Sequence, residues 1–323
     1  MSSMIRANFD DSLIKELEDD KKSVFLLADS TVRATLCSST HIVNQMRANF
    51  KTGLLETYVL GQAYTAGLLL TSCVKGDDRI SLQVECGGPI KGLTIEAWAC
   101  GAVRGYMLEN PIPLSKELTS LDTSDLYGPG FLSIVKVLEG SKEPVKGTSM
   151  LVYGNLAQDL AVYFKESEQT PSLFYLSLDF DRLGNVVGAG GLFLQALPGC
   201  SEETLNQLQE KSEKLPNLAK AIANKTSEVD YMNEAFKEFN PELLSSSFVA
   251  FSCPCTRENF LSYATSLPDG EKEEILKGAF PLEFECFNCG SIHSFTKSEM
   301  ETLFNQGEKR WFILHNVHKI KQT

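Results

Sequence analysis

Two short segments near the end of the chain, "FSCPCTRENF" (251–260) and "FECFNCGSIHSF" (284–295), contain two pairs of cysteines. One residue separates the members of the first pair and two separate those of the second: Cys253 and Cys255, Cys286 and Cys289. A kink at Pro254 lets the first two sulfurs converge, and Gly290 tolerates the left-handed backbone that a CxxC turn often needs. The pattern predicts that four thiolates bind one Zn²⁺ per chain. Because four sulfurs complete the shell, we do not expect His293 to be a ligand.

Three functions are compatible with such a site. In the first, zinc is a permanent structural part of an interaction module, which is the usual role of paired CxxC motifs. In the second, one pair exchanges thiols and disulfides, although a redox-catalytic CxxC usually opens a helix. In the third, the metal keeps the sulfurs as oxidisable thiolates, and their oxidation to disulfides unfolds a domain that depends on the metal.

The composition indicates a soluble protein with more than one domain. The chain has 323 residues and a formal net charge of −12, and an acidic surface repels phosphate backbones, so we expect no nucleic-acid partner. The apolar stretch 53–72 contains Glu56, Gln62 and Tyr64, and it is predicted to be a buried helix rather than a membrane span. Residues 1–20 lack the basic and apolar regions of a secretory signal, which indicates a cytoplasmic location.

The other five cysteines stand singly among apolar residues. In a cytoplasmic protein they are not expected to form disulfides, and we predict that they are small buried hydrophobic residues. They are Cys37, Cys73, Cys86, Cys100 and Cys200.

Residues 1–200 mix strand and helix patterns without regular alternation, which predicts an α+β domain. Alternating apolar residues indicate strands at 79–86 and 92–99, and the Gly–Pro turn between them predicts a hairpin. Two further strands and a helix with one apolar face are predicted at 131–138, 172–180 and 155–167.

Residues 201–245 are predicted to form a helical linker. They are rich in Glu, Lys, Asn and Ser, with Ser201 suited to cap a first helix and Pro216 to begin a second. Their apolar residues are widely spaced, so these helices must gain stability by packing against a neighbour.

Residues 246–323 are predicted to form a small zinc-binding domain. Thr256 caps a short helix, "LPDG" (267–270) forms a turn, and a second helix ends at Gly278. Residues on either side of the second cysteine pair form a hairpin. "SEME" (298–301) is a capping box that opens a helix ending near Gly307.

The histidines argue against a hydrolytic enzyme. Three of the four, His293, His315 and His318, lie in the C-terminal domain, so the N-terminal domain has only His41 for a Ser–His–Asp site. We therefore predict that the chain is not an enzyme.

The chain resembles the heat-shock-protein-33 family of redox-regulated holdase chaperones. Its CxC and CxxC pairs, about thirty residues apart, match the C-terminal signature of that family. Further motifs upstream occur in the same order as in the family, so that the resemblance covers nearly the whole chain: "TVRATLC" (31–37), "GGPIKGL" (87–93), "VRGYMLENP" (103–111), "SEQTPS" (167–172) and "GAGGLFLQALPG" (188–199).

The resemblance implies a mechanism. The reduced, zinc-bound protein would have little activity, and oxidation would pair Cys253 with Cys255 and Cys286 with Cys289. Zinc would leave, the C-terminal region would unfold, and the linker and a sheet surface would hold unfolding client proteins. The oxidised form would dimerise and pass clients to ATP-dependent chaperones, with no use of nucleotide and no membrane contact. Four apolar linker residues could be ordinary core, but we expect them to be packed in the reduced form and to bind clients after oxidation: Leu205, Leu208, Phe236 and Phe239.

Overall fold

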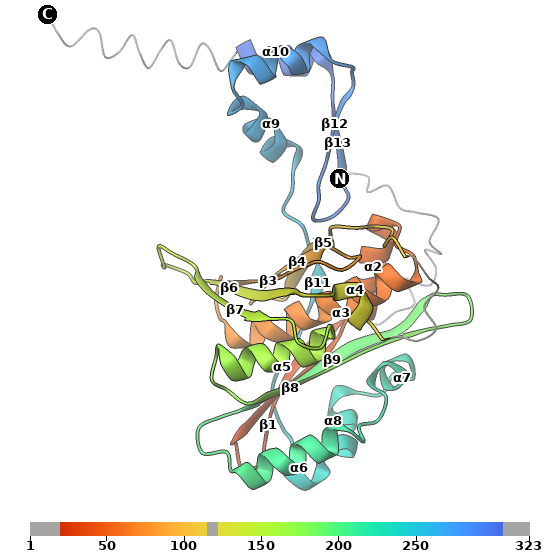
Figure 1. Cartoon of the computed structure of the whole chain (residues 1–323), viewed down its shortest axis with the longest axis vertical. Helices are drawn as coiled ribbons and strands as arrows, with labels where there is room; N and C mark the ends of the chain where they lie inside the picture. Colours follow the sequence, from red (N-terminus) through yellow and green to blue (C-terminus); the bar gives the residue numbers. More distant parts are fainter. Residues whose placement is uncertain (1–19, 115–121, 306–323) are drawn as a thin grey trace, which may run out of the picture. The chain divides into compact units, whose positions relative to one another are not determined.

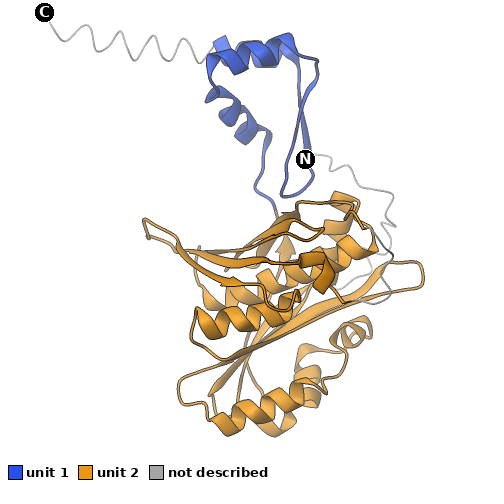
Figure 2. Ribbon diagram, in the orientation of Figure 1, with its two compact units in different colours: residues 1–5, 253–323 blue, residues 6–252 orange. Residues whose placement is uncertain are grey.

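The computed structural model describes residues 20–114 and 122–305, which fall into two compact units. The chain passes from the larger unit to the smaller one between Ser252 and Cys253 (Figure 2). Residues 246–252 therefore lie in the larger unit, whereas the sequence placed the start of the C-terminal domain at 246. Both units combine strands and helices, which confirms the α+β class.

The larger unit contains two sheets (Figure 1). In the five-stranded sheet the order is β10-β1-β2-β9-β8, and in the six-stranded sheet it is β11-β5-β4-β3-β6-β7. The strands of the first are β1 (Lys21–Leu27), β2 (Val32–Ser38), β8 (Ser172–Phe180), β9 (Val186–Ala196) and β10 (Glu242–Phe248). Those of the second are β3 (Arg79–Cys86), β4 (Gly92–Trp98), β5 (Ala102–Met107), β6 (Gly130–Val137), β7 (Val145–Met150) and β11 (Ala250–Phe251).

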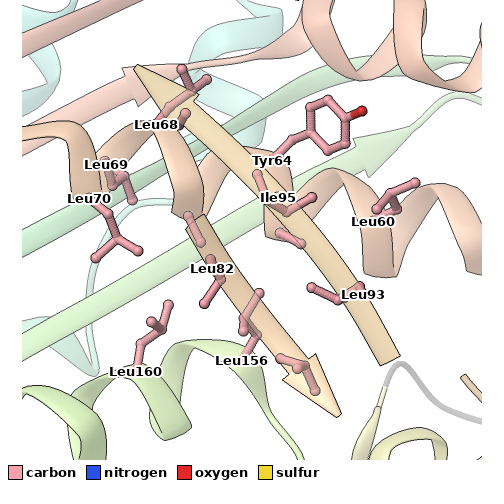
Figure 3. Close-up of a cluster of buried hydrophobic side chains, with 14 of the residues drawn as sticks. Leu60, Tyr64, Leu68, Leu69, Leu70, Leu82, Leu93, Ile95, Leu156 and Leu160 are labelled. Carbon is pink, nitrogen blue, oxygen red and sulfur yellow. The ribbon is translucent and has the colours of Figure 1, made fainter. Parts of the chain in front are cut away.

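Helices α2 (Thr40–Phe50), α3 (Leu54–Leu70) and α5 (Leu156–Glu166) lie between the two sheets. Helix α3 contacts strands of both sheets, so nearly its whole surface is buried, as predicted for the apolar stretch 53–72. Leu60 and Leu68 of α3 lie in one cluster with Leu82 and Ile95 of the six-stranded sheet and Leu160 of α5 (Figure 3). Among the described helices, none is both long and apolar enough to cross a bilayer. Two short helices complete this region: η1 (Thr71–Cys73) and α4 (Ser124–Tyr127).

The elements predicted in residues 1–200 are confirmed. Strands β3 and β4 form the expected antiparallel hairpin, with Leu82 opposite Ile95. The Asn155 side chain caps α5 by accepting a hydrogen bond from the backbone N–H of Gln158. The apolar face predicted for this helix is buried: Leu156, Leu160, Tyr163 and Phe164.

The linker forms α6 (Glu202–Ser212), α7 (Leu218–Ala223), α8 (Glu228–Phe236) and η2 (Lys237–Phe239), which cover the other face of the five-stranded sheet. Ser201 caps α6 as predicted, accepting a hydrogen bond from Thr204 N–H. The second helix begins after Asn217 rather than at Pro216, because the Asn217 side chain caps it by accepting from Lys220 N–H. The apolar side of these helices packs on Phe25, Leu36 and Leu192.

Glycines in β9 let α7 approach the sheet closely. A Cβ atom on Gly188 would lie 1.9 Å from the carbonyl oxygen of Ala219, and one on Gly190 would lie 2.5 Å from Cδ1 of Ile222. On the opposite face, a Cβ on Gly191 would lie 2.9 Å from Leu69 of α3. The "GAGG" segment therefore allows helices to pack tightly on both faces of one strand.

The smaller unit contains α9 (Arg257–Thr265), α10 (Asp269–Lys277), the hairpin of β12 (Leu282–Glu285) and β13 (Ile292–Phe295), and a helix over 297–305. Thr256 caps α9 and α10 ends at Gly278, as predicted. The expected "LPDG" turn is wrong in part, because Asp269 and Gly270 already form the first turn of α10.

The last helix begins two residues earlier than predicted, because Thr296 rather than Ser298 is its N-cap. Thr296 N–H donates to Oε2 of Glu299 at 2.8 Å, and Glu299 N–H donates to Oγ1 of Thr296 at 3.4 Å. Phe295 and Met300, on either side of this capping box, are both buried in the same small core, as in a hydrophobic staple. The expected end of this helix near Gly307 lies outside the described residues.

Gly188→Val should loosen the packing of α7 on β9. The added side chain would overlap the backbone at Ala219, and overpacking of this kind costs about 1–3 kcal/mol. Amide hydrogen exchange of residues 218–223 should become faster while α3 stays protected. Gly87→Ala is a matched control, since its Cβ would lie at an ordinary 3.6 Å from Pro129 O. Equal protection of α7 in both variants would contradict this account.

Candidate metal centre

The structure brings the four clustered cysteines together. Their sulfur atoms all lie within 4.8 Å of one another. The Sγ atoms of Cys253 and Cys286 are 3.8 Å apart, and those of Cys255 and Cys289 are 3.3 Å apart. A tetrahedral zinc–thiolate site has sulfurs about 2.3 Å from the metal and hence about 3.8 Å from one another. The donor set and its spacing therefore fit a zinc ion.

A tight turn between β12 and β13 presents the second pair. The backbone N–H of Gly290 donates to the carbonyl oxygen of Cys286 at 2.7 Å, and Cys286 N–H donates to Ser291 O at 2.9 Å. Gly290 has φ +67°, the left-handed conformation that the sequence predicted for it. The turn therefore directs both sulfurs to the same side, where Cys286 and Cys289 are buried.

The first pair lies just before α9 and is half-buried. Thr256 caps that helix, and the side chain of Asn259 donates to the carbonyl oxygen of Pro254 at 3.0 Å. These two contacts hold the CxC segment against the start of α9. The two cysteine pairs therefore lie on two different structural elements, the segment just before α9 and the turn between β12 and β13.

The electrostatics of the cluster favour a bound cation. Burial, together with hydrogen bonding to Cys289, raises the pKa of Cys255 to about 12. Hydrogen bonds with Cys253 and Cys289, together with burial, raise the pKa of Cys286 strongly. Without a cation the thiols of Cys255 and Cys286 therefore keep their protons at neutral pH. A divalent metal would displace those protons, and metal binding by this cluster is accordingly proton-linked.

The hydrophobic core around the cluster is small. Among the described residues its buried members are Ala264, Phe295, Met300 and Phe304, and partly buried apolar side chains pack against them. Arg257 adds two further contacts to this core. Its guanidinium lies 4.2 Å from the centre of the Phe295 ring, and it forms a salt bridge with Oε1 of Glu299 at 2.6 Å. Neither Arg257 nor Glu299 was predicted from the sequence to have this role. The spacing of Thr296 and Glu299 was a usable signal, whereas the pairing with Arg257 depends on the fold.

His293 is not one of the four clustered donors, although it lies beside them. Its Nε2 atom is 3.8 Å from Sγ of Cys255, and the side chain is 7% exposed.

The five single cysteines differ in exposure. Cys37 is buried as predicted, and burial raises the pKa of its thiol far above the ordinary value. The prediction is wrong for Cys100, which is exposed because it lies in the turn between β4 and β5. The others are half-buried: Cys73, Cys86 and Cys200. No disulfide joins any of the nine cysteines, all of which lie in the described ranges.

The linker residues proposed for client binding are packed in the larger unit. Leu208, Phe236 and Phe239 are buried against the five-stranded sheet, and Leu205 is half-buried. The backbone carbonyl of Phe239 also accepts a hydrogen bond from Ala28 N–H at 2.8 Å. These side chains are thus placed in a core from which they would have to be released before binding another protein.

Comparison with known proteins identifies the class. A family model described as Hsp33 protein matches residues 20–296. The chain is 34% identical over 284 residues to a 33 kDa chaperonin of Desulforamulus reducens, a match covering 88% of this chain and 96% of that protein. It is 32% identical over 281 residues to a 33 kDa chaperonin of Lachnoclostridium phytofermentans, covering 86% and 96%.

Structural comparison agrees. The crystal structure of the 33 kDa chaperonin (heat shock protein 33 homolog) of Thermotoga maritima superposes with a TM-score of 0.81 and 26% identity, covering 90% of this chain and 100% of that one. The chain belongs to the Hsp33 family. This membership supports a chaperone function, and the cysteine cluster is compatible with metal binding and redox chemistry.

Cys286→Ser should abolish tight zinc binding. Loss of one thiolate leaves an incomplete shell, and structural zinc contributes about 10–16 kcal/mol to the folding of small metal-binding domains. We expect sub-stoichiometric zinc after chelator competition and loss of dispersed NMR signals from residues 253–305. Cys100→Ser, at the exposed cysteine, is the matched control. Full zinc retention in Cys286→Ser would exclude this sulfur as a ligand.

Proposed function

We propose that this protein is a zinc-dependent, oxidation-activated holdase chaperone of the cytoplasm, and not an enzyme. In the reduced state the zinc would be held by Cys253, Cys255, Cys286 and Cys289. The single observation that carries the proposal is the cluster of four sulfurs within 4.8 Å, in a unit whose residues 253–305 bury few apolar side chains. The relatives named 33 kDa chaperonin support the chaperone part.

Oxidation acts on the sulfurs. A thiolate attacks one oxygen of hydrogen peroxide and becomes a sulfenic acid while hydroxide leaves. A neighbouring thiolate then displaces a second hydroxide from that sulfur and forms the S–S bond. We propose that the bonds form within each motif, Cys253 with Cys255 and Cys286 with Cys289. Two disulfides leave no thiolate to bind the ion.

The energies make an unfolding response reasonable. Zinc binding worth about 10–16 kcal/mol is comparable with the whole stability of most domains, about 5–15 kcal/mol. With so few buried apolar side chains, residues 253–305 would lose their fold when the thiolates are oxidised. We propose three regions: an N-terminal core over 1–200, a linker over 201–245 and a redox-sensitive region over 246–323, of which residues 246–252 lie in the larger unit.

Client binding would use the linker. Its buried apolar residues, Leu208, Phe236 and Phe239, offer surface to unfolding proteins once α6–α8 leave the five-stranded sheet, and half-buried Leu205 would join them. We propose that the oxidised form dimerises and that clients pass to ATP-dependent chaperones after reduction. The net charge of −12 helps to keep a protein with exposed apolar surface in solution.

Two alternatives predict different behaviour. A permanently structural zinc would stay bound under oxidant. A thiol–disulfide oxidoreductase would turn over disulfides, although here the CxxC lies in a hairpin turn between β12 and β13 rather than at a helix N-terminus.

Peroxide under mild heat should convert the protein to its active form. We expect release of about one zinc per chain, loss of far-UV CD signal and suppression of thermal aggregation of a client protein such as citrate synthase. Peptide mapping of the oxidised protein should find the two bonds within the motifs. Reduction followed by zinc should reverse all of these changes.

The double variant Cys37→Ser with Cys200→Ser is a control that leaves the cluster intact and should respond like the wild type. Zinc that stays bound with unchanged aggregation would refute the chaperone proposal and favour the structural site. Catalytic reduction of an added disulfide substrate would favour the oxidoreductase. Bonds between the motifs, such as Cys253 with Cys286, would refute the proposed pairing alone.

A further inference from the structure

His293 lies beside the cysteine cluster in a fixed orientation. Along β13 the side chains alternate, so that His293 and Phe295 point inward while Ile292 and Ser294 are exposed. The inward position leaves the imidazole 7% exposed and puts Nε2 at 3.8 Å from Sγ of Cys255. An N–H group at this distance can donate a hydrogen bond to sulfur.

Aromatic neighbours hold the ring. The Phe260 ring of α9 lies with its centre 4.9 Å from that of His293, and Phe284 is the residue opposite His293 in the β12–β13 pair. Phe260 and Phe284 also stack, at 5.7 Å. The imidazole therefore has apolar contacts on its ring face and a sulfur at Nε2, so its position does not depend on coordinating a metal.

Other sulfurs of the cluster also have hydrogen-bond partners nearby. The backbone N–H of Asn288 is directed to Cys286, and the thiol of Cys289 donates to the hydroxyl oxygen of Ser291 at 3.2 Å. Those two partners come from the turn itself, whereas His293, the partner of Cys255, lies on β13. Hydrogen bonds to metal-bound ligands fix their orientation and change their basicity, and a less basic thiolate is a weaker nucleophile.

We propose that His293 is a positioning residue whose Nε2–H donates a hydrogen bond to the Cys255 sulfur and slows its reaction with peroxide. This inference rests on the proposed metal site. In the first pair, one thiolate attacks the peroxide oxygen and releases hydroxide. The other thiolate then displaces a second hydroxide to give the disulfide, so two thiolates lose two electrons and one peroxide gains them.

The test uses the full-length, metal-loaded protein and three variants. His293→Phe removes the donor and keeps an aromatic ring beside Phe260, His293→Gln keeps a side-chain N–H, and His41→Phe is the same replacement in the larger unit. Zinc stoichiometry and the ¹¹³Cd NMR shift of the cadmium-loaded protein first report whether four sulfurs bind metal. Long-range ¹H–¹⁵N correlation then identifies which ring nitrogen of His293 carries the proton. Timed peroxide treatment with differential alkylation and mass spectrometry measures how fast Cys255 is modified.

We expect a four-sulfur metal site, a proton on Nε2 of His293, and oxidation of the first pair about fivefold faster in His293→Phe. His293→Gln should stay close to the wild-type rate and His41→Phe should match it. A bare or metal-bound Nε2, or a wild-type rate in a metal-loaded His293→Phe, would overturn the inference while leaving the proposed function intact. If His293→Phe does not bind metal, the position of the ring proton in the wild type tests the inference instead. A proton on Nε2 supports it, and a bare Nε2 overturns it. Absence of metal from the wild type would instead refute the proposed function.

Discussion

Repulsion between four sulfurs confined within 4.8 Å is the constraint on which the smaller unit depends. Unprotonated, they need a cation, and protonated, they leave the described part of the unit with only a small apolar core. A domain this small rarely folds on its hydrophobic core alone. In the proposed function the state of the sulfurs would therefore govern the fold of residues 253–305, to which the contacts of Arg257, Thr296 and Glu299 add further support.

The larger unit is instead built from layers of helices and sheets packed around apolar cores. Its central helix α3 is buried between two sheets, and the linker helices form a further layer on the five-stranded sheet. Because Gly188 and Gly190 have no side chains, the short helix α7 packs almost directly on the backbone of β9. The proposed function requires this closely packed layer to leave the five-stranded sheet when the C-terminal region unfolds.

Much of this could be predicted from local sequence. Cysteine spacing identified the cluster, and periodicity identified β3, β4, β8 and α5, because each of these signals depends on neighbours within a few residues. The capping box was misplaced by two residues because Thr296 and Ser298 both have a Glu three positions later, and only packing of Phe295 with Met300 selects the first. Sheet order, the close approach at Gly188 and the contact between His293 and Cys255 join residues far apart in the chain, and no local pattern encodes them.

The stretch between the linker and the first cysteine pair has its own consequence. All seven residues of β10 are exposed, this strand lies at the edge of its sheet, and β11 pairs with β5 through two residues only. Segments with so little side-chain burial are where local opening costs the least free energy. If the C-terminal region unfolds on oxidation as we propose, this stretch would be the first part of the larger unit to open.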